Sequence, residues 1–541
     1  MQEKSKRSII SMLMLATAIL AGVGIGRIIE HRKQQVSMLE NVQFIPQMGN
    51  DKLSQTLGLV AAMYVDPVSI DSLVEMAIPV LMEELDPHSV YIPKHEMQQA
   101  NESIEGEFDG IGVVFNMGTD TIVVMNVVPK GPSDKVGIQS GDRIITIEDS
   151  VVAGRKIPQN KIVNTLRGKR GTKVRLGIQR RGADELIPFT VKRDKIPINS
   201  VDAAFMLTDK VGFVKLSSFA KTSYKEMSKA LDDLRKQGMT KLIFDLRDNG
   251  GGLLDQAIYI AEMFLPNGKL VVYTEDRAGN RLEEHSRKDG KYSDLEIAIL
   301  INESSASASE ILAGAVQDND RGTVIGRRSF GKALVQRQIP YVDGSALRLT
   351  IARYYTPTGR SIQKPYNKGE QEAYDMDIYN RFMHSELFSV DSIKLADSLK
   401  YYTPEGKVVY GGGGIMPDIF VPLDTTSVSQ FYREVMAKNI LYRYTMEYTD
   451  LNRSRLTDVA NVKELNQLLD AEPDLVGGLI SYAAKQGVKI DYQPTGRERN
   501  LLMAQLRAYI GRNATFDYSG YYSNIYVIDS TMLKALEVLE D

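Results

Sequence analysis

A serine and a lysine further along the chain offer the clearest chemistry in this sequence. Ser307 stands in the run Ser-Ala-Ser-Ala-Ser-Glu (residues 305–310), and Lys332 follows Gly331. A serine hydroxyl becomes a useful nucleophile when a neighbouring base removes its proton, and lysine can be that base. The base must be a neutral amine, so burial has to lower the lysine pKa from about 10.4 to roughly 7–8. Apolar residues flank both positions, and Gln336 stands where it could orient the amine without adding charge.

The segment that ends in this lysine also has the spacing of a phosphate-binding loop. Gly326 to Lys332 fits the pattern G-x-x-x-x-G-K. In such a loop the next residue carries a hydroxyl that binds magnesium, but Ala333 stands there. No strand followed by an acidic residue lies nearby to complete a nucleotide site, so we exclude this interpretation.

A run of three glycines could supply hydrogen-bond donors to a reacting carbonyl. Residues 242–244 predict a short buried strand, and residues 245–249 end it with turn residues. The backbone N–H groups of residues 250–252 can approach a substrate closely, because glycine has no side chain. A tetrahedral intermediate needs donors of this kind at its oxyanion. An ordinary turn from strand to helix is the alternative interpretation.

The run around Ser307, together with Lys332 and Gln336, resembles the C-terminal processing peptidases, also called tail-specific proteases. The resemblance covers residues 52–423 and includes two further segments, residues 242–252 and 355–363. It implies that Ser307, the middle serine of its run, is the nucleophile. It also implies that Lys332 is the general base and that Gln336 holds this lysine.

The same resemblance implies the position of the oxyanion hole. One donor is expected in the glycine run, at Gly252 with Gly251 as the alternative, and the other at Ala308, directly after the nucleophile. No metal or other cofactor is implied.

From about residue 103 to 195 the apolar pattern changes to a period of two, with a helix expected over residues 161–167. This order of elements resembles a PDZ domain. The resemblance implies that Gly110, Ile111 and Gly112 form the carboxylate-binding loop, which binds a chain terminus while the peptide adds as a β-strand. An ordinary turn is the alternative for these three residues.

Taken together, the resemblances imply a serine endopeptidase that binds exported proteins by their C-termini and cleaves near the tail through an acyl-enzyme. The alternatives are a catalytically silent PDZ scaffold or chaperone at the membrane, and an esterase or amidase with the same Ser-Lys pair. A histidine-based site would have to use one of five scattered histidines, of which His88 is expected to be structural: His31, His88, His95, His285 and His384.

Composition excludes several other functions. The net charge of −3 gives no electrostatic reason to expect nucleic-acid binding. The chain has no cysteine, which excludes a thiol nucleophile, disulfides and a thiolate metal site. No histidine stands in a metal-binding pattern, so no metal site is expected.

The N-terminus predicts a membrane anchor. Lys4, Lys6 and Arg7 precede an apolar stretch of 19 residues, 8–26, which is near the roughly 20 that cross a bilayer as a helix. The basic flank predicts a single-pass protein of the inner membrane with its body in the periplasm. A cleaved signal peptide followed by export is the alternative.

These patterns predict a multidomain α/β protein of five parts. They are a membrane anchor or signal segment (1–30), an N-terminal helical region (38–99), a β-rich PDZ domain (103–195), an α/β protease core (199–425) and a helical C-terminal region (426–541). Residues 366–407 are polar and predict an irregular insertion. The C-terminal region is interpreted as an oligomerisation or substrate-guiding tail, so a homo-oligomer is expected as one alternative. The tyrosine-rich residues 518–526 suggest no chemistry.

Overall fold

The computed structural model describes residues 51–117, 120–425, 428–472, 474–489 and 494–541. It divides into two compact units, Met1–Glu84 and Leu85–Asp541. The apolar stretch 8–26, predicted to be a membrane anchor, lies outside the described residues. Within the described ranges, no helix combines the length and apolar character that crossing a membrane requires.

The first unit contains helices α2 (Lys52–Met63) and α3 (Ile70–Glu83). Asp51 and Ser69 cap them, because each side chain accepts a hydrogen bond from a backbone N–H of the first turn. The helical pattern predicted up to residue 99 is interrupted in the second unit. Residues there form the short strand β1 (Val90–Ile92), which pairs with β18 before helix α4 (Met97–Glu105) begins.

The predicted PDZ region forms an antiparallel sheet with the order β3-β4-β5-β7-β8. Its strands are β3 (Val113–Asn116), β4 (Ile122–Val127), β5 (Arg143–Ile147), β7 (Lys173–Gln179) and β8 (Ile187–Lys192). Helices α5 (Pro132–Val136) and α6 (Gln159–Leu166) accompany the sheet, and β2 (Glu107–Gly110) pairs with β9 (Asp194–Pro197) beside it. Strand β3 is an edge of the sheet and therefore has one side free for another strand.

The α/β core is built on a six-stranded sheet that is parallel except at β10. In spatial order its strands are β10 (Val201–Met206), β11 (Val211–Leu216), β12 (Lys241–Asp245), β15 (Glu296–Ile301), β16 (Thr323–Gly326) and β21 (Ile419–Phe420). The predicted strand 242–244 is confirmed as part of β12.

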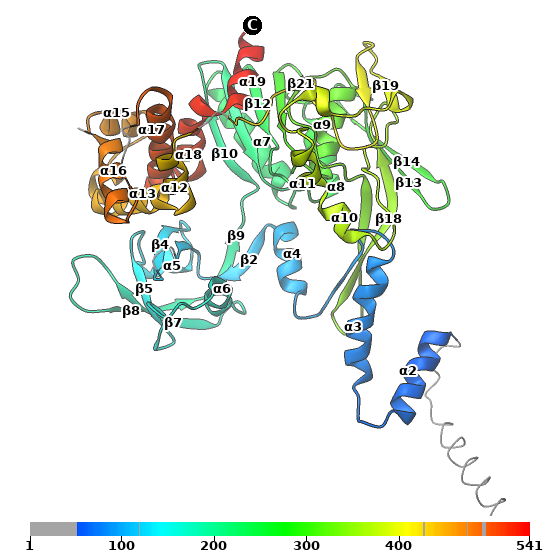
Figure 1. Cartoon of the computed structure of the whole chain (residues 1–541), viewed down its shortest axis with the longest axis horizontal. Helices are drawn as coiled ribbons and strands as arrows, with labels where there is room; N and C mark the ends of the chain where they lie inside the picture. The colour runs from blue at the N-terminus through cyan, green and yellow to red at the C-terminus, as the bar shows by residue number, and fades with distance from the viewer. Residues whose placement is uncertain (1–50, 118–119, 426–427, 473, 490–493) are drawn as a thin grey trace, which may run out of the picture. The chain divides into compact units, whose positions relative to one another are not determined.

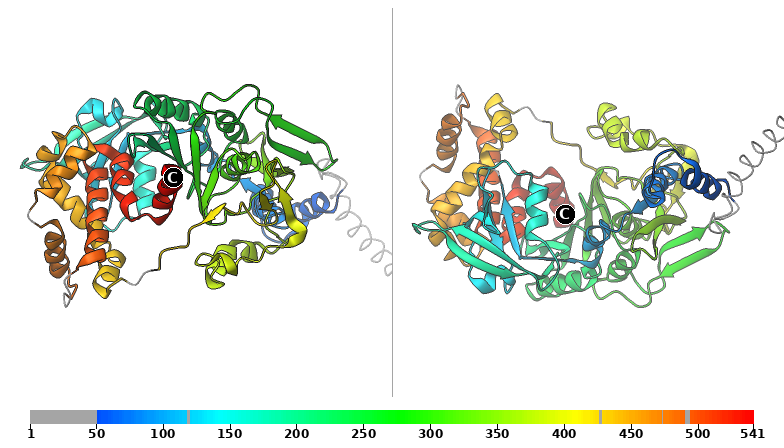
Figure 2. Two further views of the ribbon diagram at one scale, coloured as in Figure 1. Left: turned by 90° about the horizontal axis from the view of Figure 1, so that it is seen from above. Right: turned by 90° about the horizontal axis from the view of Figure 1, so that it is seen from below.

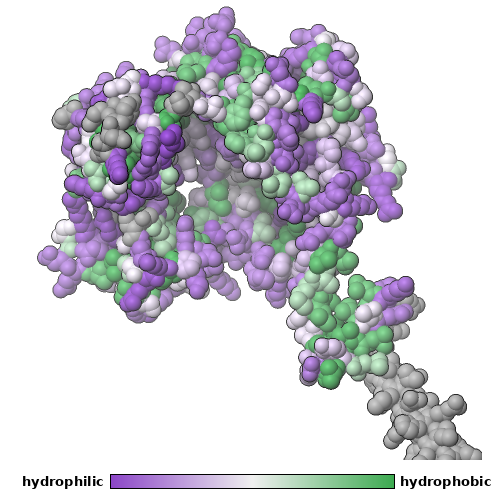
Figure 3. Space-filling view, in the orientation of Figure 1, coloured by the Kyte–Doolittle hydropathy of each residue, from purple (hydrophilic) through white to green (hydrophobic). Residues whose placement is uncertain are grey.

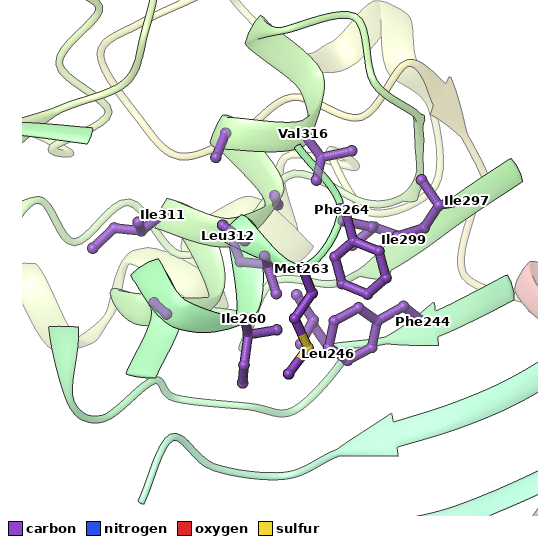
Figure 4. Close-up of a cluster of buried hydrophobic side chains, with 14 of the residues drawn as sticks. Phe244, Leu246, Ile260, Met263, Phe264, Ile297, Ile299, Ile311, Leu312 and Val316 are labelled. Atoms are coloured by element: carbon purple, nitrogen blue, oxygen red, sulfur yellow. The ribbon is translucent and has the colours of Figure 1, made fainter. Parts of the chain in front are cut away.

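Both faces of this sheet are buried, which explains why its strands are apolar almost without interruption. Leu242 and Phe244 of β12 pack on one face against helices α7 (Ser223–Lys236), α8 (Leu254–Glu262) and α9 (Ala308–Asp318). Figure 4 shows part of this cluster, with Phe244 beside Phe264. Ile243 points to the opposite face, where the C-terminal helix α19 (Ser530–Glu540) covers the sheet (Figure 1).

A second, antiparallel sheet follows the order β1-β18-β13-β14, with β17 also paired to β18. Its other strands are β13 (Leu270–Asp276), β14 (Arg281–His285), β17 (Leu334–Pro340) and β18 (Ala346–Tyr355). Strand β17 begins two residues after Lys332 and contains Gln336.

The insertion at residues 366–407 is more regular than predicted. It contains helices α10 (Gln371–Asp375) and α11 (Asp377–Met383) and strand β19 (Lys400–Tyr402), which pairs with β20 (Val408–Tyr410). The prediction of an irregular segment was wrong here because polar side chains of these helices are buried with partners. Arg381, for example, donates to the carbonyl oxygens of Ser329 and Phe330.

The C-terminal region is helical, as predicted. Its helices are α12 (Gln430–Ala437), α13 (Ile440–Leu451), α14 (Arg453–Thr457), α15 (Val462–Asp470), α16 (Leu475–Lys485), α17 (Gly496–Gly511) and α18 (Asp517–Ile525). Helices α12, α13 and α15 to α17 surround a separate apolar core (Figure 2).

Candidate active site

The parallel sheet brings the predicted site residues together at one edge. Strands β12 and β15 are neighbours, so the turns after their carboxyl ends are neighbours too, and these turns carry the glycine run and Ser307. Residues of α4, β17 and β18 complete a cavity of about 600 Å³. Its lining includes Gly250 and six predicted site residues: Gly251, Gly252, Ser307, Ala308, Lys332 and Gln336.

Ser307 occupies a strained turn between β15 and α9. Its backbone has φ 55° and ψ −113°. This conformation is energetically unfavourable for any residue that carries a side chain. The turn places the hydroxyl at the N-terminus of α9, where the helix dipole favours negative charge. Ser305 and Ser309 are fully buried, and their hydroxyls donate to the carbonyl oxygens of Leu246 and Asn249. Of these three serines, only Ser307 lines the cavity.

The glycine turn has a shape that side chains would prevent. A Cβ atom at Gly251, where φ is +101°, would lie 2.7 Å from the carbonyl oxygen of Ala306. At Gly252, where φ is +149°, it would lie 2.3 Å from the carbonyl oxygen of Phe219. Both positions therefore require glycine, and the turn packs directly against the backbone next to Ser307.

Hydrogen bonding distinguishes between the two glycines. The N–H of Gly251 donates to Asn249 Oδ1 at 2.9 Å and is already occupied. Within the described ranges, the N–H groups of Gly252 and Ala308 donate to no protein acceptor. Gly252 and Ala308 therefore have donors available for a substrate oxygen, whereas Gly251 does not.

Lys332 is largely buried, and its environment favours the neutral amine. Burial lowers the pKa of Lys332, and the positive charge of Arg348 lowers it further, against smaller opposing effects of Asp86 and Glu310. The Nζ atom donates to Gln336 Oε1 at 3.2 Å. This bond constrains the amine without adding a negative charge that would stabilise the ammonium form.

His88 fixes Gln336 through its backbone. The amide nitrogen of Gln336 donates to the carbonyl oxygen of His88, so its Oε1 atom must face Lys332. The His88 ring lies within hydrogen-bond distance of the Tyr374 hydroxyl, with Nε2 2.9 Å away. Burial, helped by the charge of Lys332, lowers the pKa of His88 to about 4, so the ring is neutral at neutral pH.

Glu310, the last residue of the serine run, joins the two reactive loops. Its fully buried carboxylate accepts the backbone N–H of Ser307 at 2.8 Å and that of Lys332 at 2.9 Å. It also accepts from the N–H of Gly331 at 2.7 Å and from the hydroxyl of Ser329 at 2.5 Å. Burial raises the pKa of Glu310 to about 7, despite these four donors.

Tyr354 of β18 makes a second connection between the same loops. Its buried hydroxyl lies 2.6 Å from the carbonyl oxygen of Lys332 and 3.1 Å from that of Ser307. One hydroxyl hydrogen is shared between these two acceptors. The backbones of both reactive residues are therefore held on their N–H side by Glu310 and on their carbonyl side by Tyr354.

No hydrogen bond joins the Ser307 hydroxyl to the Lys332 amine in the described part of the chain. Catalytic hydrogen bonds are often long in the absence of substrate and shorten when it binds. Of the histidines that the structure describes, none lines the cavity: His88, His95, His285 and His384. No group of side chains suited to holding a metal occurs among the residues that the structure describes.

The predicted carboxylate-binding loop lies at the start of β3. Gly112 has φ +73°, and Ile111 is buried in the apolar core of the PDZ region. The backbone N–H groups of Ile111 and Gly112 have no acceptor within the described ranges. Gly110 is the last residue of β2, so the three residues connect β2 to the free edge strand.

The sequence alone assigned no role to Glu310, Tyr354 or Arg348. In the structure Glu310 and Tyr354 form hydrogen bonds with the backbones of the reactive residues, and Arg348 lowers the pKa of Lys332. Glu310 offered a signal, because an acidic residue inside an otherwise small and apolar helix start must find partners when buried. Tyr354 and Arg348 offered none, since both stand in an ordinary strand pattern. His88 was expected to be structural, and its contact with Gln336 is consistent with that expectation.

Models of known protein families match three parts of this chain. The model of peptidase family S41 matches residues 210–370, and the PDZ domain model matches residues 110–195. A family of unknown function matches residues 431–516.

Three curated relatives are similar over much of their length. A carboxy-terminal-processing protease of Bartonella bacilliformis is 38% identical over 56% of this chain and 70% of that protein. The carboxy-terminal processing proteases CtpA and CtpB of Bacillus subtilis are 33% and 31% identical. They match 60% and 65% of this chain, and 68% and 74% of their own lengths. This chain therefore belongs to the carboxy-terminal processing proteases of peptidase family S41, and it carries a PDZ domain.

Proposed function

We propose that this protease works through a Ser307–Lys332 dyad and an acyl-enzyme, on proteins whose C-termini its PDZ domain binds. One observation carries the proposal. A largely buried lysine with a lowered pKa lines the same cavity as a serine at a helix N-terminus and two unoccupied backbone N–H groups. Each component that acyl transfer requires is therefore present in one place.

In the first step the neutral Lys332 amine takes the proton of the Ser307 hydroxyl while the Ser307 oxygen bonds to the scissile carbonyl carbon. The carbonyl oxygen becomes an oxyanion, which accepts hydrogen bonds from the N–H groups of Gly252 and Ala308. Gln336 keeps the amine in position throughout, because its own amide is fixed by the His88 carbonyl. The positive end of the α9 dipole further stabilises the negative charge.

The tetrahedral intermediate then collapses. The C–N bond breaks, the Lys332 ammonium gives its proton to the departing amine, and the remaining acyl group is an ester of Ser307. In the second half, Lys332 takes a proton from water, and the resulting hydroxide attacks the ester. Ser307 regains its proton from the lysine as the new carboxylic acid leaves.

Substrate selection by C-terminus fits the PDZ region. The terminal carboxylate would accept hydrogen bonds from the Ile111 and Gly112 N–H groups, and the peptide would pair with the free edge of β3. The protein nature of the substrate follows from this mode of binding, because a small ester or amide has no peptide backbone to pair.

We also propose that residues 8–26 anchor the protein in the inner membrane with its body in the periplasm. The basic residues before this apolar stretch support the orientation. The first unit presents exposed apolar side chains, including Leu59, Met63 and Val80. Figure 3 shows apolar surface on this unit, which supports self-association into a homo-oligomer. Fractionation of cells expressing the whole chain or residues 33–541 tests the anchor, and light scattering of the latter tests the oligomer.

The catalytic proposal is tested with residues 33–541 and an unfolded protein that bears an apolar C-terminal tail. Mass spectrometry identifies the products for wild type and for S307A, K332A and S305A. We expect S307A and K332A to lower turnover by about 10⁴-fold or more, because members of one catalytic unit fail together. S305A should keep most activity while losing about 2 kcal/mol of stability, since it removes the bond that the hydroxyl donates to the Leu246 carbonyl and the bond that it accepts from the Asn302 N–H.

Two outcomes would contradict the proposal. Cleavage that survives in S307A would place the nucleophile elsewhere. Tail-dependent binding without any cleavage by wild type would favour a PDZ scaffold on the protease fold.

A further inference from the structure

The last helix of the chain is anchored to the strand that leads into the glycine turn. Helix α19 packs against β12, β15 and β16, and Met532, Ala535 and Leu539 lie in the same apolar cluster as Ile243 of β12. At one end, Arg247, two residues after β12, pairs with Asp529 at the N-cap of α19. At the other end, the Lys241 side chain donates to the carbonyl oxygen of Leu539.

The lengths of the two elements match. An 11-residue helix is about 16 Å long at 1.5 Å per residue, and the five residues of β12 span about 16 Å at 3.3 Å per residue. The start of α19 is attached beyond the end of β12, and the end of α19 is attached to the start of β12. The helix therefore runs antiparallel to the strand. Figure 1 shows the helix beside the strand.

The attachment at Asp529 reaches a buried charge cluster. Arg247 Nη1 lies 2.8 and 3.0 Å from the two carboxylate oxygens of Asp529, while its Nη2 donates to Asp245 Oδ2 at 2.7 Å. Lys215 also faces Asp245 and donates to the Arg247 carbonyl. Although burial alone would raise the pKa of Asp245, the two cations hold it below its usual value. Without Asp529, one face of the buried guanidinium would have no charged partner.

Asn249 connects Arg247 to the glycine turn. Asn249, two residues on and fully buried, accepts the N–H of Gly251 on its side chain. Its carbonyl accepts the N–H of Ala306 at 3.0 Å and the hydroxyl of Ser309 at 2.8 Å. A shift of Arg247 would therefore move both the oxyanion donors and the turn that carries Ser307.

We infer that Asp529 is a positioning residue for the oxyanion hole, and that helix α19 is part of the catalytic core. The inference rests on the proposed function, because it assigns Gly252 and Ala308 their role there. It also explains the tyrosine-rich segment before the helix. Tyr522 packs on Phe213 of β11, with ring centroids 5.5 Å apart, and so helps to seat α19 on the sheet.

The test compares three substitutions in the full chain, using the tailed unfolded protein as substrate. D529S keeps a good helix cap but is too short to reach Arg247. We expect kcat to fall about tenfold with KM unchanged, because small displacements of catalytic groups cost rate rather than binding. D529N keeps both the cap and an acceptor for Nη1, so it should recover most of the lost kcat.

K241A is the matched control. It removes the attachment at the far end of the same helix and the same strand, and should lower the melting temperature without changing kcat below the unfolding transition. If D529S and K241A lower kcat equally, the role of α19 is general stability and the inference is overturned. If D529S has full kcat, it is also overturned. Wild-type turnover that does not depend on Ser307 would instead refute the proposed function.

Discussion

Two glycine turns in this protein present free backbone N–H groups, but different forces hold them. The turn of residues 250–252 is fixed by polar contacts, through Asn249 beside it and through Glu310 and Arg247 in the adjoining segments. The turn of residues 110–112 is held by apolar packing, with Ile111 buried and Gly112 against Ile196 and Pro132, and by backbone hydrogen bonds to the carbonyls of Ile111 and Gly112.

The difference matches what each turn must bind. An oxyanion exists only near the transition state, and its donors act by being in place beforehand, which directional hydrogen bonds in a buried site ensure. A chain terminus is a stable carboxylate that can adjust as it binds. A turn held by apolar packing and backbone hydrogen bonds, without buried charges beside it, is therefore sufficient. Substitutions at the first turn should therefore change kcat, and those at the second should change KM.

The largest effect is expected for E310Q. The new amide group would face N–H donors that need an acceptor, so at least one loop would lose its hydrogen bond to residue 310. We expect kcat to fall about 100-fold, as for the loss of one oxyanion donor. Binding of a tail peptide, measured by titration calorimetry, should not change.

E303Q is the control for this substitution. Glu303 is a half-buried carboxylate near the same loops, paired with Arg327 at 2.8 Å, and it touches neither reactive residue. An equal loss of kcat in E303Q would mean that any buried carboxylate here matters equally, and would remove the special role of Glu310.

A smaller effect is expected for R348M, and it should depend on pH. Arg348 lowers the pKa of Lys332, so its removal raises that pKa and leaves less neutral amine at a given pH. Since the base must be neutral, kcat/KM rises with pH, and the midpoint of this rise should move to higher pH in R348M. The rate at neutral pH should therefore fall by about threefold to tenfold, while the high-pH plateau stays intact.

The control for R348M is R353M, an exposed arginine on the same strand outside the cavity, which should leave the midpoint in place. A uniform loss of rate at every pH in R348M would show that Arg348 acts on the substrate and not on Lys332.

An effect of similar size, but on KM and not on the pH midpoint, is expected for G112A, at the second turn. Gly112 has φ +73°, and a Cβ there would lie 3.1 Å from Ile196 Cδ1. We expect KM for a tailed substrate to rise about tenfold, the effect of about 1–2 kcal/mol of strain in the binding loop. Neither kcat nor the cleavage of the same substrate with an amidated C-terminus should change.

G137A serves as the matched control, because Gly137 also has positive φ and nothing lies within 4 Å of its Cβ position. It carries the same backbone penalty within the PDZ region but away from the loop. If G112A impaired tailed and amidated substrates alike, the loop would not be the carboxylate site.

Much of the secondary structure could be predicted because it depends on local patterns. Alternating or continuous apolar residues gave the strands of the PDZ region and the core, and the helices of the C-terminal region had helical spacing. The insertion was misjudged, because a buried arginine such as Arg381 looks the same in a sequence as an exposed one. Besides Asp377, one helical turn before it, its partners are the backbone carbonyls of Ser329 and Phe330, which no side-chain pattern records.

The sequence by itself determined the candidate chemistry: a serine among small residues, a lysine with an amide four residues on, and glycines where backbone must approach a substrate. Only the tertiary structure decided how these groups are supported. Glu310 and Tyr354 tie the two loops together, the His88 carbonyl orients Gln336, and Asp529 reaches Arg247 across 282 residues. Such contacts depend on which segments the sheet brings side by side, and therefore on the packing of the whole core, which no local pattern specifies.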